Sequence, residues 1–350
     1  MFNFFNQFNK VFVIAEIGSN HNGSFDLAKE MIEAAAQAGV DAVKFQTYRA
    51  ENLITRDIPV FPRARPLGYQ TQFDRFRDLE FSQDQFHELA GYAHKNKIIF
   101  LSTPFDLNSV DLLDPLVPAF KIASADLINF QLLRYVASKN KPVILSTGQA
   151  VVEEIDSAIA IFSSQQVSLL HCVSAYPTND AQANLLSIPF LRSRYKINVG
   201  YSDHTIGTLA CLAAVALGAI IIEKHFTFDK TQPFGDHVLS ADPIDLRLLI
   251  QDIRRLEKML GSEKKFCQDC ESFSKTNLRR SLHAQVDISA GTIIKNEMIV
   301  SVISGKGIPA NYIDQIIGKK ILNNLCKGEV FTENNFEQEI LSNNGKKYEK

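Results

Sequence analysis

Eight short apolar runs, each followed by a stretch of helical periodicity, fill the first 260 residues and constrain the fold more than any other feature. The runs are rich in Val, Ile, Leu and Phe and nearly free of charge, as expected for parallel strands covered by helices. They span residues 11–16, 41–46, 98–102, 118–124, 142–146, 167–172, 197–202 and 219–225. Helices are expected between them, for example at 26–39, 82–96, 208–218 and 242–261.

Eight strand–helix units are the number found in a (β/α)8 barrel of the TIM type, and this is the predicted fold of residues 1–261. A doubly wound open sheet is the alternative. The first apolar run is not followed by a Gly-x-Gly-x-x-Gly motif, which disfavours an open sheet of the dinucleotide-binding kind.

Polar residues stand at the C-terminal ends of six of the eight runs. Barrel enzymes carry their active sites at this end of the strands. A single polar residue at a strand end is more commonly explained by its closeness to water. Burying Lys, Glu or His, however, costs free energy unless the side chain is paired or binds a ligand. Six such positions therefore favour a functional site. They are Glu16, Lys44, Lys121, Ser146, Ser202 and His225.

A lysine pair is the first candidate constellation. Lys44 and Lys121 are expected to project into the same barrel mouth, with Ser124, Ser146 and Ser202 at neighbouring strand ends. Ammonium groups supply positive charge, and hydroxyl and backbone N–H groups supply hydrogen-bond donors. The predicted ligand is a small anion such as a phosphorylated carboxylic acid.

A histidine pair is the second candidate. His204 and His225 end the seventh and eighth runs, so both imidazoles could bind one divalent cation, with water and substrate oxygens as the other ligands. Either residue alone is as readily structural. His171 lies within an apolar run and is expected in the core or behind the site.

The longest connection, residues 49–80, has the length of a lid over an active site. Its Arg63, Arg65 and Tyr69 are expected either to face an anionic site or to form a solvated surface.

The C-terminal part follows a different pattern. Residues 262–281 lose the apolar periodicity and are expected to form a linker. Segments 287–299 and 324–336 then align at an offset of 37 residues, with Gly291 over Gly328. This repeat predicts a small β-rich domain over 282–340, which is thin enough to need another surface to pack on. Residues 341–350 are expected to be a flexible tail.

Composition limits the class of partner and the compartment. Lys and Arg number 37 against 39 Asp and Glu, so the chain has no overall basic field for nucleic acid. It contains no uncharged apolar stretch of membrane-spanning length and no signal-peptide pattern, so a cytoplasmic protein is expected. Five cysteines argue against a disulfide framework, and the lone pair Cys267 and Cys270 lacks the second pair that a zinc site needs.

These motifs together resemble the sialic acid synthases, which include the N-acetylneuraminate, legionaminic acid and pseudaminic acid synthases. The matching stretches cover the whole predicted barrel in order, and residues 282–340 resemble the antifreeze-like (SAF) domain of that family. The stretches are AEIGSNHNGS (15–24), GVDAVKFQT (39–47), FLSTPFD (100–106), AFKIASAD (119–126), PVILSTG (142–148), LLHCVSAYPT (169–178), GYSDHT (200–205), ALGAIIIEKHFT (216–227) and GDHVLSADP (235–243).

The resemblance implies a transferase reaction. Phosphoenolpyruvate condenses with an N-acylated amino sugar and water to give a nine-carbon 2-keto acid and phosphate. The sugar would be N-acetylmannosamine or a 2,4-diacetamido-trideoxyhexose. A divalent metal assists in this family, usually manganese, with magnesium or cobalt as alternatives. The resemblance also implies a domain-swapped homodimer.

The resemblance assigns residue roles by motif. Glu16 would be the acid/base residue, and His204 and His225 the metal ligands. Phosphoenolpyruvate would bind to Lys44, Lys121, Ser124, Ser146 and Ser202, and the sugar to Gln46, Asp126, Ser174, Tyr176 and Asp236.

One departure from the family concerns the C-terminal domain. The family's second domain usually carries an Arg that reaches the partner's active site and contacts the N-acyl group, but Ile303 stands at that position. Lys306 could substitute, or the sugar could carry a more apolar substituent. The stretch 235–243 is more similar to neuraminic and legionaminic acid synthases than to pseudaminic acid synthases.

Two other functions remain open at this stage. A barrel aldolase, or another phosphoenolpyruvate aldol synthase, could act on a phosphosugar, and a Schiff-base aldolase would use Lys44 or Lys121 covalently. A non-catalytic carbohydrate- or ice-binding protein is the alternative outside enzymes, and the polar strand ends argue against it.

Overall fold

The computed structural model describes residues 9–163 and 167–341. Its contacts divide the chain into two compact units, Met1–Gly261 and Ser262–Lys350, which are described separately below. Of the predicted tail, residues 342–350 lie outside the described part.

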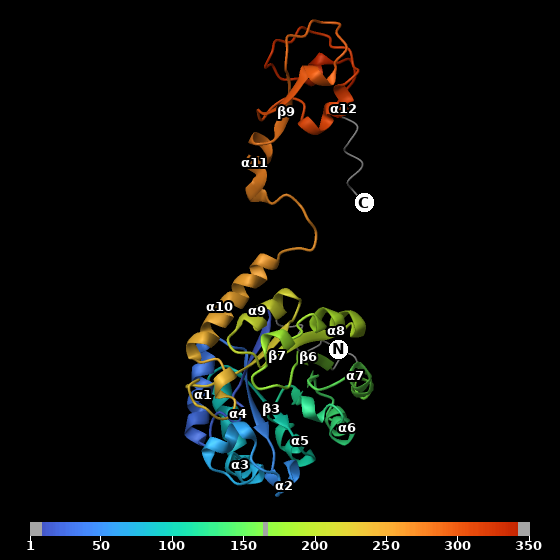
Figure 1. Cartoon of the computed structure of the whole chain (residues 1–350). Coiled ribbons are helices and arrows are strands. Elements are labelled where there is room, and N and C mark those ends of the chain that lie inside the picture. Colours follow the sequence, from blue (N-terminus) through green and yellow to red (C-terminus); the bar gives the residue numbers. More distant parts are fainter. Residues whose placement is uncertain (1–8, 164–166, 342–350) are drawn as a thin grey trace. The chain divides into compact units, whose positions relative to one another are not determined.

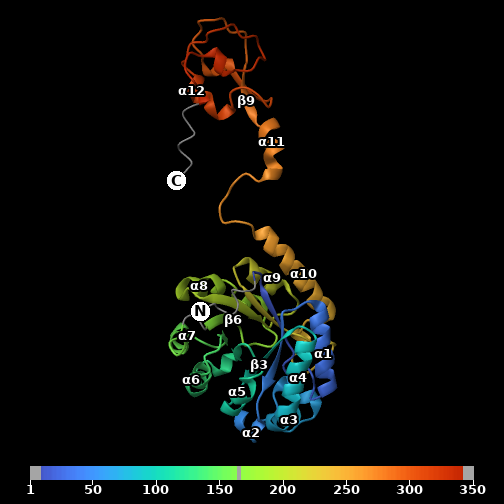
Figure 2. The same ribbon diagram turned by 180° about the vertical axis from the view of Figure 1, so that it is seen from behind.

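The first unit is the predicted eight-stranded parallel barrel (Figures 1 and 2). The hydrogen-bonded order is β3-β2-β1-β8-β7-β6-β5-β4, and residues of β4 contact β3 to close the ring. Every strand falls on its predicted apolar run. The strands are β1 (Phe12–Glu16), β2 (Ala42–Thr47), β3 (Ile99–Pro104), β4 (Phe120–Ile122), β5 (Val143–Ser146), β6 (Val167–Cys172), β7 (Asn198–Asp203) and β8 (Ile221–His225).

Helices surround these strands, as Figure 1 shows. Their ends follow local sequence signals. The Ser24 hydroxyl caps α1 by accepting the Leu27 N–H, and Asp242 caps α10, which has Pro243 in its first turn. The helices are α1 (Phe25–Ala38), α4 (Gln83–Lys95), α5 (Leu107–Leu113), α6 (Phe130–Ser138), α7 (Val152–Ile159), α8 (Ser187–Tyr195), α9 (Leu209–Ala216) and α10 (Pro243–Leu260).

The barrel interior has an apolar floor beneath a polar layer. Side chains alternate along each strand, so the inward residues of β1 are Phe12, Ile14 and Glu16, and those of β2 are Ala42, Lys44 and Gln46. The buried floor is formed by Phe12, Ile14, Ala42, Leu101, Ala119, Ile144, Leu170 and Ile221. The next inward position is polar on every strand except β6, where it is Cys172; the polar residues are Glu16, Lys44, Thr103, Lys121, Ser146, Ser202 and Glu223. The strand ends predicted a polar residue for six of these strands, and β3 is the addition.

The long connection between β2 and α4 is folded. It contains α2 (Ala50–Leu53), a 3-10 segment (Pro62–Leu67) and α3 (Gln72–Asp78), and an isolated bridge joins Pro59 to Thr71. Thr71 caps α3 by accepting the Asp74 N–H at 3.1 Å. This connection therefore holds its side chains on short helices and is not an irregular loop.

The second unit is small and β-rich. Within the expected linker lies the short exposed helix α11 (Ser272–Asn277). Strands β9 (Arg280–Ala284) and β10 (Ile299–Ile303) pair antiparallel, and α12 (Ile313–Ile316) follows. A separate core of aliphatic and Phe side chains, including Leu282, Ile308 and Phe331, packs inside it.

The sequence repeat corresponds to a two-fold pattern of hydrogen bonds. Ile288 and Leu325 exchange both backbone hydrogen bonds at 2.8 Å. Gly291 donates its N–H to the Ile321 carbonyl oxygen, and Gly328 donates its N–H to the Ala284 carbonyl oxygen. The repeat offset of 37 residues relates Gly291 to Gly328 and Ala284 to Ile321, so the two bonds are equivalent. Both glycines have positive φ, at 86° and 87°, where a side chain would be strained.

Among residues 9–163 and 167–341, no helix combines the length and the apolar character needed to cross a bilayer.

Candidate active site

A cavity of about 290 Å³ opens at the C-terminal ends of the barrel strands. It brings together residues from all eight strands or the loops after them, and also α3 and the 3-10 segment of the long connection. The sequence-predicted residues that line it are Glu16, Lys44, Gln46, Lys121, Ser124, Ser146, Ser174, Tyr176, Ser202, His204, His225 and Asp236.

The lysine pair is buried and paired with carboxylates. The Lys44 ammonium group lies 2.6 Å from Glu16 and donates to the Thr103 hydroxyl at 3.2 Å. The Lys121 ammonium group donates to the Ser146 hydroxyl at 2.7 Å. Both lysines lie 3.8 Å from the Glu223 carboxylate. Two lysines and two glutamates thus share one buried pocket. Each lysine ammonium group still has an N–H that can donate to a ligand.

The Glu16 and Glu223 carboxyl groups have different pKa values, because burial and neighbouring charges act on them to different extents. Burial raises the pKa of Glu16 to about 7, despite the opposing charge of Lys44, and the nearby Glu223 charge adds to the rise. Burial also acts on Glu223, but Lys121 and Lys44 outweigh it and hold the pKa of Glu223 below its usual value. Glu223 is therefore ionised, whereas Glu16 can hold or release a proton near neutral pH.

The lysines also differ from each other. Burial lowers the pKa of Lys121, and Glu223 offsets this only in part. Burial acts in the same direction on Lys44, but Glu16 and Glu223 together leave the pKa of Lys44 raised. Lys44 therefore retains its proton, and with it its positive charge, more strongly than Lys121 does.

The histidine pair stands at the ends of β7 and β8, with ring centroids 5.3 Å apart. His204 Nδ1 lies 2.8 Å from the Val173 carbonyl oxygen and must donate to it, so Nε2 has a free lone pair when the ring is neutral. Burial lowers the pKa of His204, but Cys172 and the Val173 carbonyl outweigh burial and leave the pKa raised. His225 Nδ1 is buried without a hydrogen-bond partner among the described residues. Burial, with His204 and Lys44 nearby, holds the pKa of His225 well below its usual value, so its ring is neutral.

Imidazoles in their neutral forms fit a divalent cation as two of its ligands, and His204, whose pKa is raised, would release its proton to bind one. In the described part of the chain, no group of three or more His, Cys, Asp or Glu side chains has the geometry of a complete metal site. Water and substrate oxygens would have to supply the remaining ligands.

The far side of the cavity carries aromatic and guanidinium groups. Tyr176 stacks on His204 with ring centroids 4.0 Å apart, and the Arg63 guanidinium lies 4.4 Å from the centre of the Tyr176 ring. Arg63 forms an ion pair with Asp236 at 3.1 Å, and Asp236 lies 3.8 Å from His225 Nδ1. The helix α3 adds the buried side chains of Gln72 and Arg75.

Some candidate residues lie elsewhere. Asp126 follows Ser124 in a 3-10 turn, accepts a hydrogen bond from Asn129 at 3.1 Å and is not among the cavity-lining residues. In the long connection, Arg63 reaches the cavity, Arg65 is exposed and Tyr69 donates to Asp78. His171 is buried behind the barrel wall, as expected, with Nε2 2.8 Å from the Ala183 carbonyl oxygen.

Sequence reasoning missed several residues of the cavity, including Glu223, Thr103, Gln72 and Arg75. Glu223 shares a strand face with His225, so alternation along β8 was the signal for it. Thr103 follows from the same rule on β3. Arg75 had no such signal, because it lies on a short helix of the long connection, where strand alternation does not apply.

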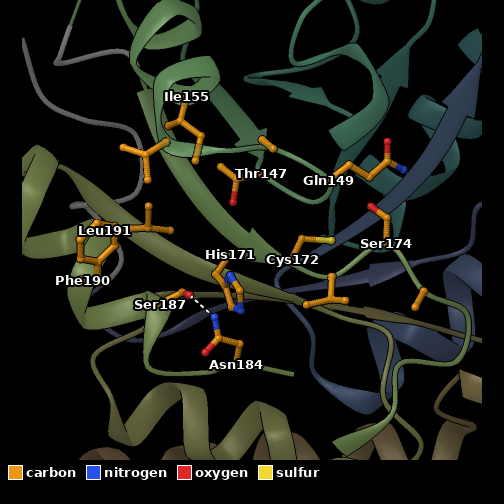
Figure 3. A pocket seen from close by; sticks show the side chains of 14 residues that line it. Thr147, Gln149, Ile155, His171, Cys172, Ser174, Asn184, Ser187, Phe190 and Leu191 are labelled. Atoms are coloured by element: carbon orange, nitrogen blue, oxygen red, sulfur yellow. Dashed lines mark hydrogen bonds between the residues drawn. The ribbon is translucent and has the colours of Figure 1, made fainter. Parts of the chain in front are cut away.

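A second cavity, of about 430 Å³, lies beside the first, between the β5–β6 wall and helices α7 and α8 (Figure 3). It shares Gln149, Cys172 and Ser174 with the first cavity. Its other walls are mainly apolar, and the figure shows Asn184 and Ser187 engaged with each other, at 2.9 Å. It contains neither lysine nor arginine, so the charged chemistry belongs to the first cavity.

Comparison with known proteins identifies the family of the chain. The NeuB family model matches residues 31–265, and the SAF domain model matches residues 279–337. The N,N'-diacetyllegionaminic acid synthase of Campylobacter jejuni is 39% identical over 338 residues, covering 93% of this chain and 99% of that protein. The human N-acetylneuraminate-9-phosphate synthase is 36% identical over 342 residues, covering 96% and 94%.

A solved structure supports the same relationship. The N-acetylneuraminic acid synthetase of Leptospira borgpetersenii, crystallised with citrate, is 39% identical and superposes with a TM-score of 0.69 over 76% of this chain and 90% of that one. The resemblance to sialic acid synthases and to their C-terminal domain is confirmed. With a family match over more than half of the chain and relatives aligned along nearly all of it, the protein belongs to the NeuB family and is an enzyme that carries a SAF domain.

Proposed function

We propose that this enzyme condenses phosphoenolpyruvate with an N-acylated amino sugar and water, releasing phosphate and a nine-carbon 2-keto acid. The observation that carries the proposal is the buried cluster of Lys44, Lys121, Glu16 and Glu223 beside His204 and His225. The named activities of the relatives in Campylobacter jejuni and human are of this general kind.

The lysine pair suits phosphoenolpyruvate, which carries a phosphate and a carboxylate. Lys44 and Lys121 supply two charges in a pocket from which water is largely excluded, where electrostatic attraction is strong. Ser146 and Ser202 are buried beside them, and the Ser124 hydroxyl accepts the Gly148 N–H at 3.0 Å. The Ser146 and Ser124 hydroxyls accept in these contacts, so their O–H groups are free to donate to an anion, whereas the Ser202 O–H donates to the Glu223 carboxylate at 3.0 Å.

The reaction forms one carbon–carbon bond and breaks one carbon–oxygen bond. C3 of phosphoenolpyruvate attacks the aldehyde carbon, water adds to C2, and phosphate leaves from C2 with the bonding electron pair. The attacking water gives up both of its protons as C2 becomes a carbonyl: one balances the proton gained by the aldehyde oxygen, and the other leaves with the phosphate. Glu16, with a pKa of about 7, is suited to exchange these protons, and the ionised Glu223 can stabilise positive charge at C2.

A divalent cation, manganese by preference, would be held by His204 and His225 and would polarise the aldehyde oxygen. The orphaned Nδ1 of His225 and the outward lone pair of His204 support this assignment. Gln46, which donates to Glu16 at 3.2 Å, together with Tyr176, Ser174 and Asp236, would contact the sugar.

The test is consumption of phosphoenolpyruvate in the presence of manganese across a panel of N-acylated amino sugars, with the keto-acid product identified by mass spectrometry. Consumption should require both the sugar and the metal. Absence of turnover with every N-acyl mannosamine and diacetamido sugar, from protein that binds phosphoenolpyruvate normally, would refute the proposed reaction.

A Schiff-base aldolase is the second candidate, because burial lowers the pKa of the Lys121 amine and so favours its nucleophilic form. Borohydride reduction in the presence of pyruvate distinguishes the two. An aldolase would gain a covalent adduct on Lys121 without metal, whereas the synthase would gain none.

We also propose that the SAF domain acts in a homodimer, covering the barrel mouth of the partner subunit. Ile303 is exposed at the end of β10, and its cross-strand neighbour is Arg280. An arginine is therefore available beside the position where the family usually has one. Removal of residues 282–350 should abolish activity or dimerisation, and an active monomeric barrel would contradict this role.

A further inference from the structure

The second cavity has the size and lining of a small-molecule site. Its volume of about 430 Å³ lies within the range of known ligand pockets, and none of its lining residues is charged. Val152, Ile155, Phe190 and Leu191 supply the apolar side chains of its helical wall. An ion would lose its hydration there without an opposite charge to offset the loss. The cavity therefore suits an uncharged molecule with an apolar body.

Several polar side chains of this cavity already have partners. The Thr147 hydroxyl donates to the Leu170 carbonyl oxygen at 3.0 Å. The Asn184 amide donates to the Ser187 hydroxyl at 2.9 Å, as Figure 3 shows. These groups have their main hydrogen bonds within the protein and do not depend on a ligand.

His171 is different, because it presents an unmet hydrogen-bond acceptor. The Ala183 carbonyl oxygen lies 2.8 Å from His171 Nε2 and can only accept, so Nε2 carries the proton and Nδ1 has the lone pair. Among the described residues, no donor is hydrogen-bonded to Nδ1. The residue is 7% exposed, and Figure 3 shows its ring among the side chains that line the cavity. Burial lowers the pKa of His171, which keeps the lone pair available at neutral pH.

A buried acceptor among apolar walls defines the ligand that fits best. Leaving the acceptor without a hydrogen bond costs free energy. A water molecule could satisfy Nδ1 but would gain nothing from the apolar walls. A molecule with one O–H or N–H group and a ring-sized apolar body satisfies the acceptor and covers the walls at the same time.

The wall between the two cavities also holds one of the proposed metal ligands. Cys172 lines both cavities, and its Sγ lies 3.8 Å from His204 Nδ1. Val173 lines the second cavity, and its carbonyl oxygen accepts the hydrogen bond from His204 Nδ1. Gln149, which lines both cavities, has a φ of 67°, a strained value for a residue with a side chain. A molecule packed on this wall would restrict Cys172 and Val173, and through them the His204 ring.

We propose that the second cavity is an effector site for a small uncharged molecule that combines a ring-sized apolar body with one hydrogen-bond donor. The donor binds His171 Nδ1, and the apolar body packs against α7 and α8. The occupied site steadies the wall at Cys172 and Val173 and so strengthens metal binding at His204. This last effect rests on the proposed function, in which His204 is a metal ligand.

Phenol and anisole test the binding site, because both have one aromatic ring and only phenol has a donor. Each is titrated into the full-length protein and followed by nuclear magnetic resonance of the probe. Phenol should bind about fivefold more tightly than anisole, as expected for one neutral hydrogen bond. His171→Phe keeps a ring and removes the acceptor, so the two probes should then bind equally. His87→Phe, at an exposed position of α4, should leave the fivefold ratio unchanged.

A cavity-filling variant tests the location without altering His171. Ala150 lines the cavity and is partly exposed, so Ala150→Phe can place a ring in the space. Phenol and anisole should both bind at least tenfold more weakly to this variant. The measurement stays decisive even if His171→Phe lowers stability by leaving the Ala183 carbonyl oxygen without its donor. Phenol binding that survives Ala150→Phe, or that saturating phosphoenolpyruvate or N-acetylmannosamine displaces, would place the probe elsewhere and overturn the inference.

Manganese binding tests the effect on the metal site. In electron paramagnetic resonance titrations, saturating phenol should lower the Kd for manganese about fivefold in the native protein, and much less in Ala150→Phe. By linkage, manganese should tighten phenol binding by the same factor. An unchanged manganese Kd would refute the effector role. If manganese does not bind at all, the proposed metal site fails and the effector role fails with it, whereas the ratio of phenol to anisole binding still decides whether the cavity is a binding site.

Discussion

The Lys224 ammonium group lies 2.8 Å from the Asp203 carboxylate, and neither side chain has any exposed surface. Lys224 also donates to the Thr205 carbonyl oxygen, at 2.6 Å. Asp203 and Thr205 flank His204 in the sequence, and Lys224 directly precedes His225. The ion pair thus joins the ends of β7 and β8 on the outer face of the barrel wall, behind the two imidazoles, and fixes their separation.

Breaking this ion pair should cost stability and metal affinity together. Lys224→Met leaves the Asp203 carboxylate buried without its cation and should lower the free energy of unfolding by about 3–5 kcal/mol. Manganese binding, followed by electron paramagnetic resonance on the folded protein, should weaken because the histidine pair is less well fixed. Arg194→Met, which removes an exposed ion pair with Asp156, is the control and should change neither quantity appreciably.

The double variant Lys224→Met/Asp203→Leu sharpens this test. It removes both charges and should recover much of the lost stability without restoring the metal affinity. If manganese binds to the single and double variants as tightly as to the native protein, the ion pair does not position the histidines.

Glu16 should take up a proton when phosphoenolpyruvate binds. In the free enzyme burial raises the pKa of Glu16 to about 7, and a bound anion nearby raises it further. Above pH 7 the free carboxylate is largely ionised, so binding should draw a fraction of a proton from the buffer. Calorimetry in buffers of different ionisation enthalpy at pH 8 measures this uptake. The uptake should be smaller in Glu16→Gln, and equal uptake in both proteins would exclude Glu16 as the responsive group.

His21 should make the fold less stable in mild acid. Its ring stacks on Phe81 with centroids 4.4 Å apart, its Nδ1 accepts the Gly23 N–H at 3.1 Å, and burial lowers its pKa to about 4. The unfolded chain binds the proton near the ordinary value of 6.5, so it takes up protons first as the pH falls. The contribution of neutral His21 to the free energy of unfolding is constant above pH 7. It is lost progressively between pH 6.5 and 4, by up to about 3 kcal/mol.

Urea unfolding at pH 7 and pH 5 measures this effect. His21→Gln should show a smaller loss of stability between the two pH values than the native protein. His94→Gln, at an exposed position of α4, should keep the native pH dependence. An unchanged pH dependence in His21→Gln would mean that His21 titrates normally in the folded state.

Removal of the metal should abolish activity and spare the fold. Chelation should stop turnover, and added manganese should restore it. His225→Ala should lose metal-dependent turnover while keeping its thermal midpoint, because the removed Nδ1 makes no hydrogen bond with the described residues. His171→Gln, in the second cavity, should retain metal dependence. Full activity of His225→Ala would refute the ligand assignment.

The barrel and its polar strand ends were predictable because both follow from periodicity. Alternation along β2 and β8 placed Lys44 and His225 inward, and the apolar residues below them identified the strands. Arg75 and Gln72 were not predictable in this way, since their position depends on how residues 49–80 fold back over the barrel. Asp126 stays a predicted sugar contact: it lies in the 3-10 turn after β4, where it accepts a hydrogen bond from Asn129.

Each half of the SAF domain supplies hydrogen-bond partners for backbone groups of the other half. Gly291 of the first half bonds to Ile321, and Gly328 of the second half bonds to Ala284. A chain that contained only one half would expose these N–H and carbonyl groups on an unpaired edge. Such a half could satisfy them only by pairing with a second copy of itself, so the covalent link between the halves makes a self-complementary dimer into a single folding unit.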